Sequence, residues 1–123
     1  MSQKGKVVEQ WDAGRFEQAV LKTPGVVLVD FGATWCAPCR AMESVVEQLG
    51  RGFEGRVRVG TVDVDQQPDL AVRYQIRSLP TFKVFADGRL AGELIGTQSI
   101  RTLQALLENA LSEVESSSGS RRS

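Results

Sequence analysis

The sequence contains no histidine, and this absence excludes much ordinary enzyme chemistry. Histidine is the commonest general base, activates most serine and cysteine nucleophiles, and supplies many zinc and iron ligands. Cysteine is scarce as well, with 2 residues in a chain of 123. Two cysteines cannot complete a four-ligand zinc site within one chain, and they cannot form the disulfide framework of a small secreted domain. The role of these two cysteines must therefore be sought elsewhere.

The chain also lacks an excess of charge and a long apolar stretch. The 15 Lys and Arg residues balance 15 Asp and Glu residues, so no strong field attracts nucleic acid. The longest apolar run, Val26 to Val29, is too short to span a bilayer. No apolar run follows the lysines near Met1, as it would in a secretory signal. We therefore expect a cytoplasmic monomer that binds neither nucleic acid nor membranes.

The length and composition fit a single small globular domain. Residues 115–123 are composed of serine, arginine, glycine and glutamate, with no apolar side chain to bury. Such a segment cannot offset the entropy lost on ordering. We predict a folded domain over residues 1–114 and a disordered tail over residues 115–123.

The apolar pattern changes period along the chain, which is typical of alternating strands and helices. The β-branched run from Val26 to Phe31 predicts a central strand buried on both faces. Asp87-Gly88 is a strong hairpin signal and predicts that the strands on either side are antiparallel neighbours. The pattern predicts an α/β fold whose sheet order stays open. Further strands are expected over 57–64, 81–85 and 90–95, and helices around 16–20, from Cys36 to Gly50, over 68–74 and from the cap at Ser99 to 114.

The two cysteines, Cys36 and Cys39, stand three residues apart where a predicted strand passes into a predicted helix. Free backbone N–H groups and the positive end of the helix dipole favour a thiolate at the first cysteine. The second lies one turn along the same helix face, within reach of a mixed disulfide on the first. We interpret Cys36 as the nucleophile and Cys39 as the resolving thiol.

Two alternatives for this pair have a purely structural role. A permanent disulfide across three residues closes a small loop and contributes only about 2 kcal/mol, and a reducing compartment would remove it. Half of a zinc site would require a second chain to complete the ligand set. We favour the redox interpretation and expect no bound metal.

Asp30 is the anomalous residue of the predicted central strand because it places a carboxyl group among apolar neighbours. Burial should raise the pKa of this carboxyl, and an unpaired charge there is costly. Since Asp30 precedes Cys36 on the adjoining strand, it could exchange a proton with Cys39 during resolution. The alternative is that Asp30 only satisfies a buried polar group.

Several short motifs together resemble the thioredoxin family, over roughly residues 4 to 114. No single motif is specific, but their order and spacing are. The resemblance implies the thioredoxin fold, in which a central mixed five-stranded sheet is flanked by helices on both faces. The motifs are Val-Asp-Phe at 29–31, Trp-Cys-Ala-Pro-Cys at 35–39, Val-Asp-Val-Asp-Gln-Gln-Pro at 62–68, Leu-Pro-Thr at 79–81, and Gly96.

The same resemblance implies a protein-disulfide reductase that needs no bound cofactor. Thioredoxin reductase would restore the dithiol with electrons from NADPH, and disulfide-containing proteins would be the clients. The family's cis proline corresponds to Pro80, whose preceding residue pairs with a client chain as an added strand. The remaining implied substrate-binding residues are Trp35, Ala37, Pro38, Ile76, Leu79 and Gly96.

Three positions depart from the family pattern. Ala37 stands where glycine is usual, which trims backbone freedom at the start of the helix. Gly32 stands where many members have a second tryptophan, and Thr61 stands where a lysine often accompanies the buried aspartate. An alternative function is that of a thioredoxin-like binding or chaperone subunit whose thiols are incidental.

Overall fold

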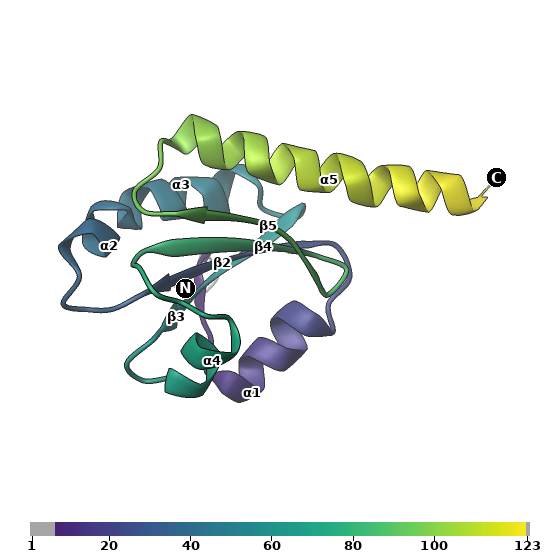
Figure 1. The fold of residues 1–123 in the computed structure, drawn as a ribbon. Helices are drawn as coiled ribbons and strands as arrows, with labels where there is room; N and C mark the ends of the chain where they lie inside the picture. The colour runs from purple at the N-terminus through teal and green to yellow at the C-terminus, as the bar shows by residue number, and fades with distance from the viewer. Residues whose placement is uncertain (1–6, 123) are drawn as a thin grey trace, which may run out of the picture.

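A five-stranded mixed sheet forms the centre of the computed structural model, which describes residues 7–122 and their side chains as far as residue 116 (Figure 1). The strand order is β1-β3-β2-β4-β5, where β3 pairs in parallel with β1 and β2, and β4 pairs antiparallel with β2 and β5. The strands are β1 (Glu9–Gln10), β2 (Val26–Gly32), β3 (Val57–Asp63), β4 (Thr81–Ala86) and β5 (Arg89–Ile95).

Helices cover both faces of this sheet, as the predicted thioredoxin fold requires (Figure 1). Helices α3 and α5 lie on one side, and α1 and α4 lie on the other. The α/β class and the mixed five-stranded sheet are therefore confirmed. The helices are α1 (Ala13–Phe16), which continues into the π-helix η2 (Glu17–Leu21), α2 (Ala37–Ala41), α3 (Glu43–Gly52), α4 (Pro68–Arg73) and α5 (Ile100–Arg122).

Strand β2 is buried on both faces, as its β-branched run predicts. Alternate side chains of a strand point to opposite faces, so β2 contributes to two separate cores. Val26 and Leu28 pack beneath α3 and α5, whereas Val27, Val29 and Phe31 pack against α1, η2 and α4. The same alternation turns Asp30 and Gly32 toward the α3 side of the sheet.

The turn between β4 and β5 confirms the predicted antiparallel hairpin. Asp87 has φ of 52° and Gly88 has φ of 84°, so both residues adopt the left-handed conformation. A two-residue hairpin turn with the twist of its strands requires this conformation at both positions, and the Asp-Gly pair tolerates it.

The predicted helix from Cys36 to Gly50 is wrong in one respect, because it is interrupted at Met42. The backbone N–H of Met42 bonds to the carbonyl of Cys39, three residues back, at 3.1 Å, which tightens the turn between α2 and α3. The apolar spacing alone does not distinguish this tighter turn from regular α-helix. Strand β1 was also missed, since two polar residues carry no strand periodicity.

The last helix begins as predicted, with the hydroxyl of Ser99 accepting the N–H of Thr102 at 3.1 Å. Helix α5 then continues past residue 114 to Arg122 and extends beyond the body of the domain in Figure 1. Residue 114 is therefore not the end of the helix. The division of the chain there and the disorder of residues 115–123 stay predictions, and residue 123 lies outside the described part.

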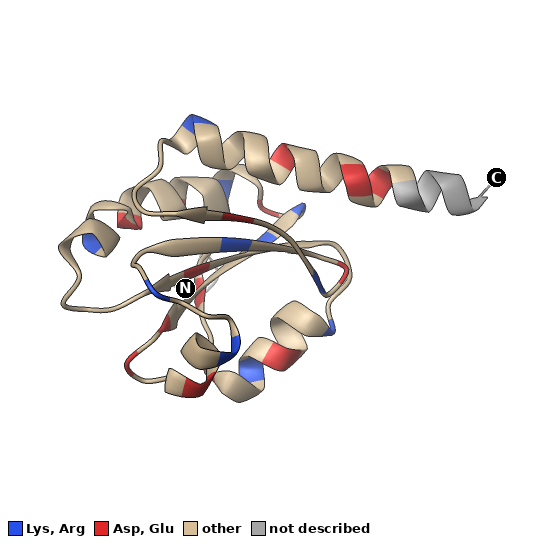
Figure 2. Cartoon of the chain, viewed as in Figure 1, with Lys and Arg blue, Asp and Glu red and all other residues tan. Residues whose placement is uncertain are grey.

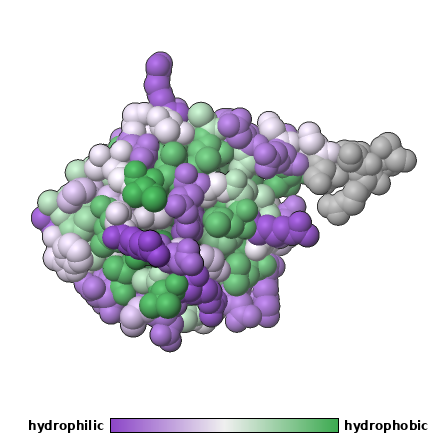
Figure 3. All heavy atoms as spheres, viewed as in Figure 1, coloured by the Kyte–Doolittle hydropathy of each residue, from purple (hydrophilic) through white to green (hydrophobic). Residues whose placement is uncertain are grey.

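Charged residues of both signs are interspersed along the elements rather than collected on one face (Figure 2). The space-filling view likewise shows apolar and polar residues interspersed over the face presented (Figure 3). Within the described residues, no helix combines the length and apolar character needed to cross a membrane.

Gly60 provides a test of the packing between β1 and β3. A Cβ atom at this position would lie 2.5 Å from ring atoms of Trp11, whereas a Cβ on Gly52 meets nothing within 4 Å. We expect Gly60→Ala to lower the free energy of unfolding by about 1–3 kcal/mol through overpacking. Gly52→Ala should leave stability unchanged or raise it by less than about 1 kcal/mol. Denaturant titration of the two variants measures both effects, and equal stabilities would contradict the expectation.

Candidate active site

Cys36 and Cys39 lie at the end of the central strand, where β2 passes through a short turn into α2. Cys36 is the N-cap of α2, with the extended backbone that this position requires. The two cysteines form a disulfide, their Cα atoms are 5.2 Å apart, and both side chains are buried. The site is therefore described in its oxidised form.

A backbone N–H of α2 contacts the sulfur of Cys36. The N–H of Cys39 donates to Sγ of Cys36 at 3.2 Å, so the cap interaction is made by the sulfur itself. Pro38 occupies the first turn of α2, where its missing N–H removes no helical hydrogen bond. A sulfur that accepts an N–H at a helix start is better stabilised as a thiolate than as a thiol.

Asp30 lies in the middle of β2 and is 7% exposed. Its Oδ1 atom is buried without a hydrogen-bond partner. Burial raises the pKa of this carboxyl from 3.8 to about 7, and the negative charge of Glu43 adds to the increase. The predicted rise of the Asp30 pKa is thus confirmed, and the carboxyl can accept or release a proton near neutral pH.

Gly32 marks the point at which Asp30 and Cys39 approach each other. A Cβ atom at Gly32 would lie 3.3 Å from Sγ of Cys39 and 3.9 Å from Oδ1 of Asp30. Both atoms therefore lie within 4 Å of one point beside the Gly32 backbone. The structure brings the predicted carboxyl and the predicted resolving thiol near one another.

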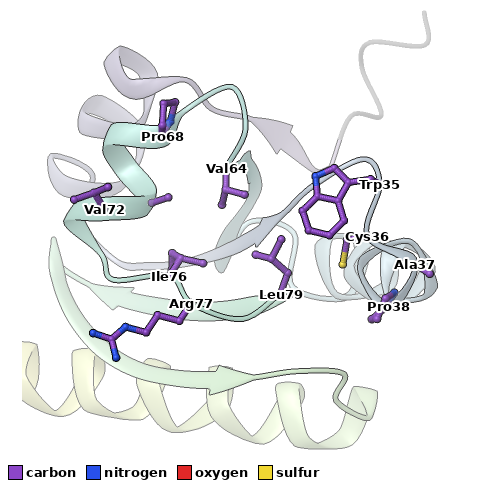
Figure 4. A pocket seen from close by; sticks show the side chains of 11 residues that line it. Trp35, Cys36, Ala37, Pro38, Val64, Pro68, Val72, Ile76, Arg77 and Leu79 are labelled. Carbon is purple, nitrogen blue, oxygen red and sulfur yellow. The ribbon is translucent and has the colours of Figure 1, made fainter.

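An apolar cavity of about 560 Å³ opens beside Cys36 (Figure 4). Five of the residues predicted to contact substrate line it together with this cysteine. Trp35 forms one side, with its indole 66% exposed and its Nε1–H donating to Asp65 at 2.6 Å. The five are Trp35, Ala37, Pro38, Ile76 and Leu79.

The two other predicted substrate-binding residues, Pro80 and Gly96, adjoin the cavity without lining it. The Leu79–Pro80 peptide bond is cis, as the family resemblance implies. The carbonyl of Pro80 accepts the N–H of Gly96 at 2.8 Å, which places these two residues side by side next to Leu79.

The far side of the cavity consists of residues that the sequence analysis missed. They come from α4, which faces Trp35 across the cavity in Figure 4, and from the segments that follow β3 and α4. Val72 of α4 is 77% exposed, and an exposed apolar residue inside an amphipathic helix is the one signal that the sequence offered. These lining residues are Val64, Pro68, Ala71, Val72 and Arg77.

Thr61 provides no charge to the site, in accord with its departure from the family pattern. Its hydroxyl donates to the backbone carbonyl of Glu9 at 3.5 Å instead. Within the part of the chain that the structure describes, no group of three His, Cys, Asp or Glu side chains is arranged to hold a metal ion.

Three comparisons with known proteins all match this chain to thioredoxins. The family model described as Thioredoxin matches residues 7–109. The chain is 40% identical to "Thioredoxin 1" of Nostoc sp. over 96 residues, covering 78% of this chain and 90% of the relative. It is 36% identical to "Thioredoxin" of Pseudomonas aeruginosa over 102 residues, covering 83% and 94% of the two chains.

A solved structure supports the same relationship. A mutant thioredoxin from Halobacterium salinarum superimposes with a TM-score of 0.78 at 34% identity, covering 85% of this chain and 90% of the other. The matched span includes the dithiol, the cis proline and the strand that holds the buried carboxyl. The chain belongs to the thioredoxin family, whose members are thiol–disulfide oxidoreductases.

Proposed function

We propose that Cys36 is the attacking thiol when this protein reduces the disulfides of other proteins. The Cys36 thiolate attacks one sulfur of the client disulfide, the client S–S bond breaks, and the displaced client thiolate takes a proton from solvent. The observation that carries this assignment is that Cys36, and not Cys39, lines the apolar cavity open at the surface. A client that binds in this cavity therefore adjoins Cys36.

Cys39 is proposed to complete the reaction. Its thiol transfers a proton to the carboxylate of Asp30, the resulting thiolate attacks Sγ of Cys36, and the reduced client leaves as a thiolate. The products are the Cys36–Cys39 disulfide and a client that has gained two electrons. The approach of Sγ of Cys39 and Oδ1 of Asp30 to each other beside Gly32, and the cavity that both residues line, support this proton transfer.

The client is proposed to bind along the apolar cavity beside the dithiol. Trp35, Ile76 and Leu79 offer an apolar surface that does not demand a particular sequence, and the backbone at Leu79 is available to an extended chain. Proteins with accessible disulfides are the expected clients.

Thioredoxin reductase is the proposed source of electrons, since members of this family are generally reduced by that enzyme. The reaction needs no cofactor bound to this chain. We place the protein in the cytoplasm, where a reducing environment keeps the dithiol in its active form, and assign it to electron transport and redox homeostasis there.

The two cysteine variants should fail at different steps. Cys36→Ser is expected to abolish reduction of a protein disulfide and to form no adduct with it. Cys39→Ser should still attack, but it should accumulate as a mixed disulfide with the client because the resolving sulfur is absent. Non-reducing electrophoresis and mass spectrometry measure the adduct. An adduct that accumulates on Cys36→Ser instead would reverse the two roles.

A variant that lacks both thiols separates catalysis from a binding function. The Cys36→Ser/Cys39→Ser protein should bind a reduced client segment but should not support growth that depends on disulfide reduction. If it replaces the unmodified protein in the cell, the thiols are not what the cell requires of it.

Asp30→Asn tests the buried carboxyl through the pH dependence of stability. Because the pKa of Asp30 rises to about 7 on folding, the native state holds this proton longer than the unfolded state does. Its contribution to stability is therefore present at low pH and is lost as the pH rises through about 7. Between pH 4 and 8, the variant should gain up to about 4 kcal/mol relative to the unmodified protein. Denaturant titrations of both oxidised proteins across this range measure the gain, and a constant difference would contradict it.

A further inference from the structure

The two sulfur atoms of the dithiol open onto different cavities. Cys36 lines the apolar cavity at the surface, whereas Cys39 lines a second cavity of about 460 Å³ behind the site. Asp30, Gly32 and Glu43 also line this rear cavity. A client that covers the first cavity therefore leaves the second one open.

A third cavity, of about 400 Å³, adjoins the rear cavity between β1 and α3. Gln10, Asp30, Glu43 and Thr61 line both spaces, so Asp30 stands between them. Each volume is many times the roughly 30 Å³ that a water molecule occupies in the liquid, and the shared lining is polar. These spaces can therefore hold water that reaches the buried carboxyl.

We propose that the proton taken up by Asp30 leaves through this rear cavity, and that Glu43, which lines the cavity together with Asp30 and Cys39, is a positioning residue that controls the transfer. The proposal rests on the proposed function, because it assumes that Cys39 resolves a mixed disulfide on Cys36. It assigns a role to Glu43 that neither the motifs nor the sequence analysis indicates.

The proton balance explains why an exit is required. Resolution converts the Cys39 thiol and the Asp30 carboxylate into a disulfide sulfur and a carboxylic acid, and the client leaves as a thiolate. Asp30 must lose its proton before it can serve as a base again. While a client covers Cys36, the surface cavity is not available for that exchange. Asp30 and the exposed residue Glu43 both line the rear cavity, which therefore offers a separate route to solvent.

Glu43 is placed to act on Asp30 through charge. It begins α3, on the face of the sheet toward which Asp30 points, and its exposed side chain remains in contact with solvent. Its negative charge opposes ionisation of Asp30, which keeps that carboxyl a stronger base than burial alone would make it.

Other titratable side chains also line these spaces within the described residues. Asp12 and Asp63 line the rear cavity together with Cys39, and Glu47 lines the third cavity. Glu47 forms an ion pair with Arg51 at 3.3 Å, so part of its charge is balanced. Asp12, Asp63 and Glu47 all carry carboxyl groups. Negative charge near Asp30 favours the protonated form of its carboxyl.

Two features particular to this sequence create the rear opening. Gly32 has no side chain to fill the space between Sγ of Cys39 and Oδ1 of Asp30. Thr61 is a short neutral residue that lines both cavities in place of a long cation. Water can therefore contact Cys39 from behind, and no lysine at position 61 stabilises the Asp30 carboxylate.

The test follows the two steps separately in the full reduced chain. One equivalent of an aromatic disulfide that releases a coloured thiolate is mixed with the protein in a stopped-flow instrument. The first phase reports attack by Cys36, and the second reports release of the remaining aromatic thiolate by Cys39. The rate of each phase is measured as a function of pH.

Glu43→Gln should shift the midpoint of the second phase to lower pH by about half a unit, because loss of one negative charge lowers the pKa of Asp30. The first phase should keep its pH profile. Glu54→Gln, which makes the same change in the turn after α3, is the matched control and should move neither phase. An unchanged second-phase midpoint in Glu43→Gln, or an equal shift in Glu54→Gln, overturns the proposal.

Gly32→Ala tests the opening itself. The added methyl group would occupy the space between Sγ of Cys39 and Oδ1 of Asp30, so the second phase should slow at least threefold while the first phase keeps its rate. A second phase at the unmodified rate overturns the water-filled route. Absence of any second phase in the unmodified protein would instead refute the role of Cys39, and with it the proposed function.

Discussion

The central position of β2 is the constraint on which the site depends. This strand pairs with β3 on one side and β4 on the other, and apolar side chains cover both of its faces. Its end is therefore held rigidly, and the turn that follows presents Cys36 at the start of α2. The strand also fixes Asp30 within the sheet, where Oδ1 of its carboxyl is buried without a hydrogen-bond partner.

The proposed chemistry depends on the different surroundings of the two sulfur atoms, which are covalently joined in the oxidised state. Cys36 adjoins the apolar surface cavity, where a client can bind, and Cys39 adjoins the polar rear cavity, where water can enter. One sulfur is thus suited to attack an external disulfide, and the other is suited to lose a proton internally. Helix α2 holds the two cysteines one turn apart, close enough to bond, with Cys36 at the first cavity and Cys39 at the second.

Electrostatics at the buried carboxyl differ from what the family resemblance implies. The pKa of Asp30 rises chiefly because of burial, and Glu43 adds negative charge where a lysine would have opposed the increase. Thr61 uses its hydroxyl to bond the backbone of β1 instead. Burial and the negative charge of Glu43 together keep this carboxyl near Cys39 basic.

The sequence by itself determined the local elements, because period-two alternation, the Asp87-Gly88 turn and the Ser99 cap act over a few residues. The sequence also indicated the dithiol, from two cysteines three apart where a strand passes into a helix, and the unusual carboxyl of Asp30, from its apolar neighbours. Only the tertiary structure decided the sheet order, the break at Met42 and the far wall of the surface cavity. The sheet order and the cavity wall depend on contacts between segments distant in the chain, and the break at Met42 depends on a backbone hydrogen bond that the apolar spacing does not indicate. Glu43 and Asp30 line the same cavities because folding brings the start of α3 next to β2.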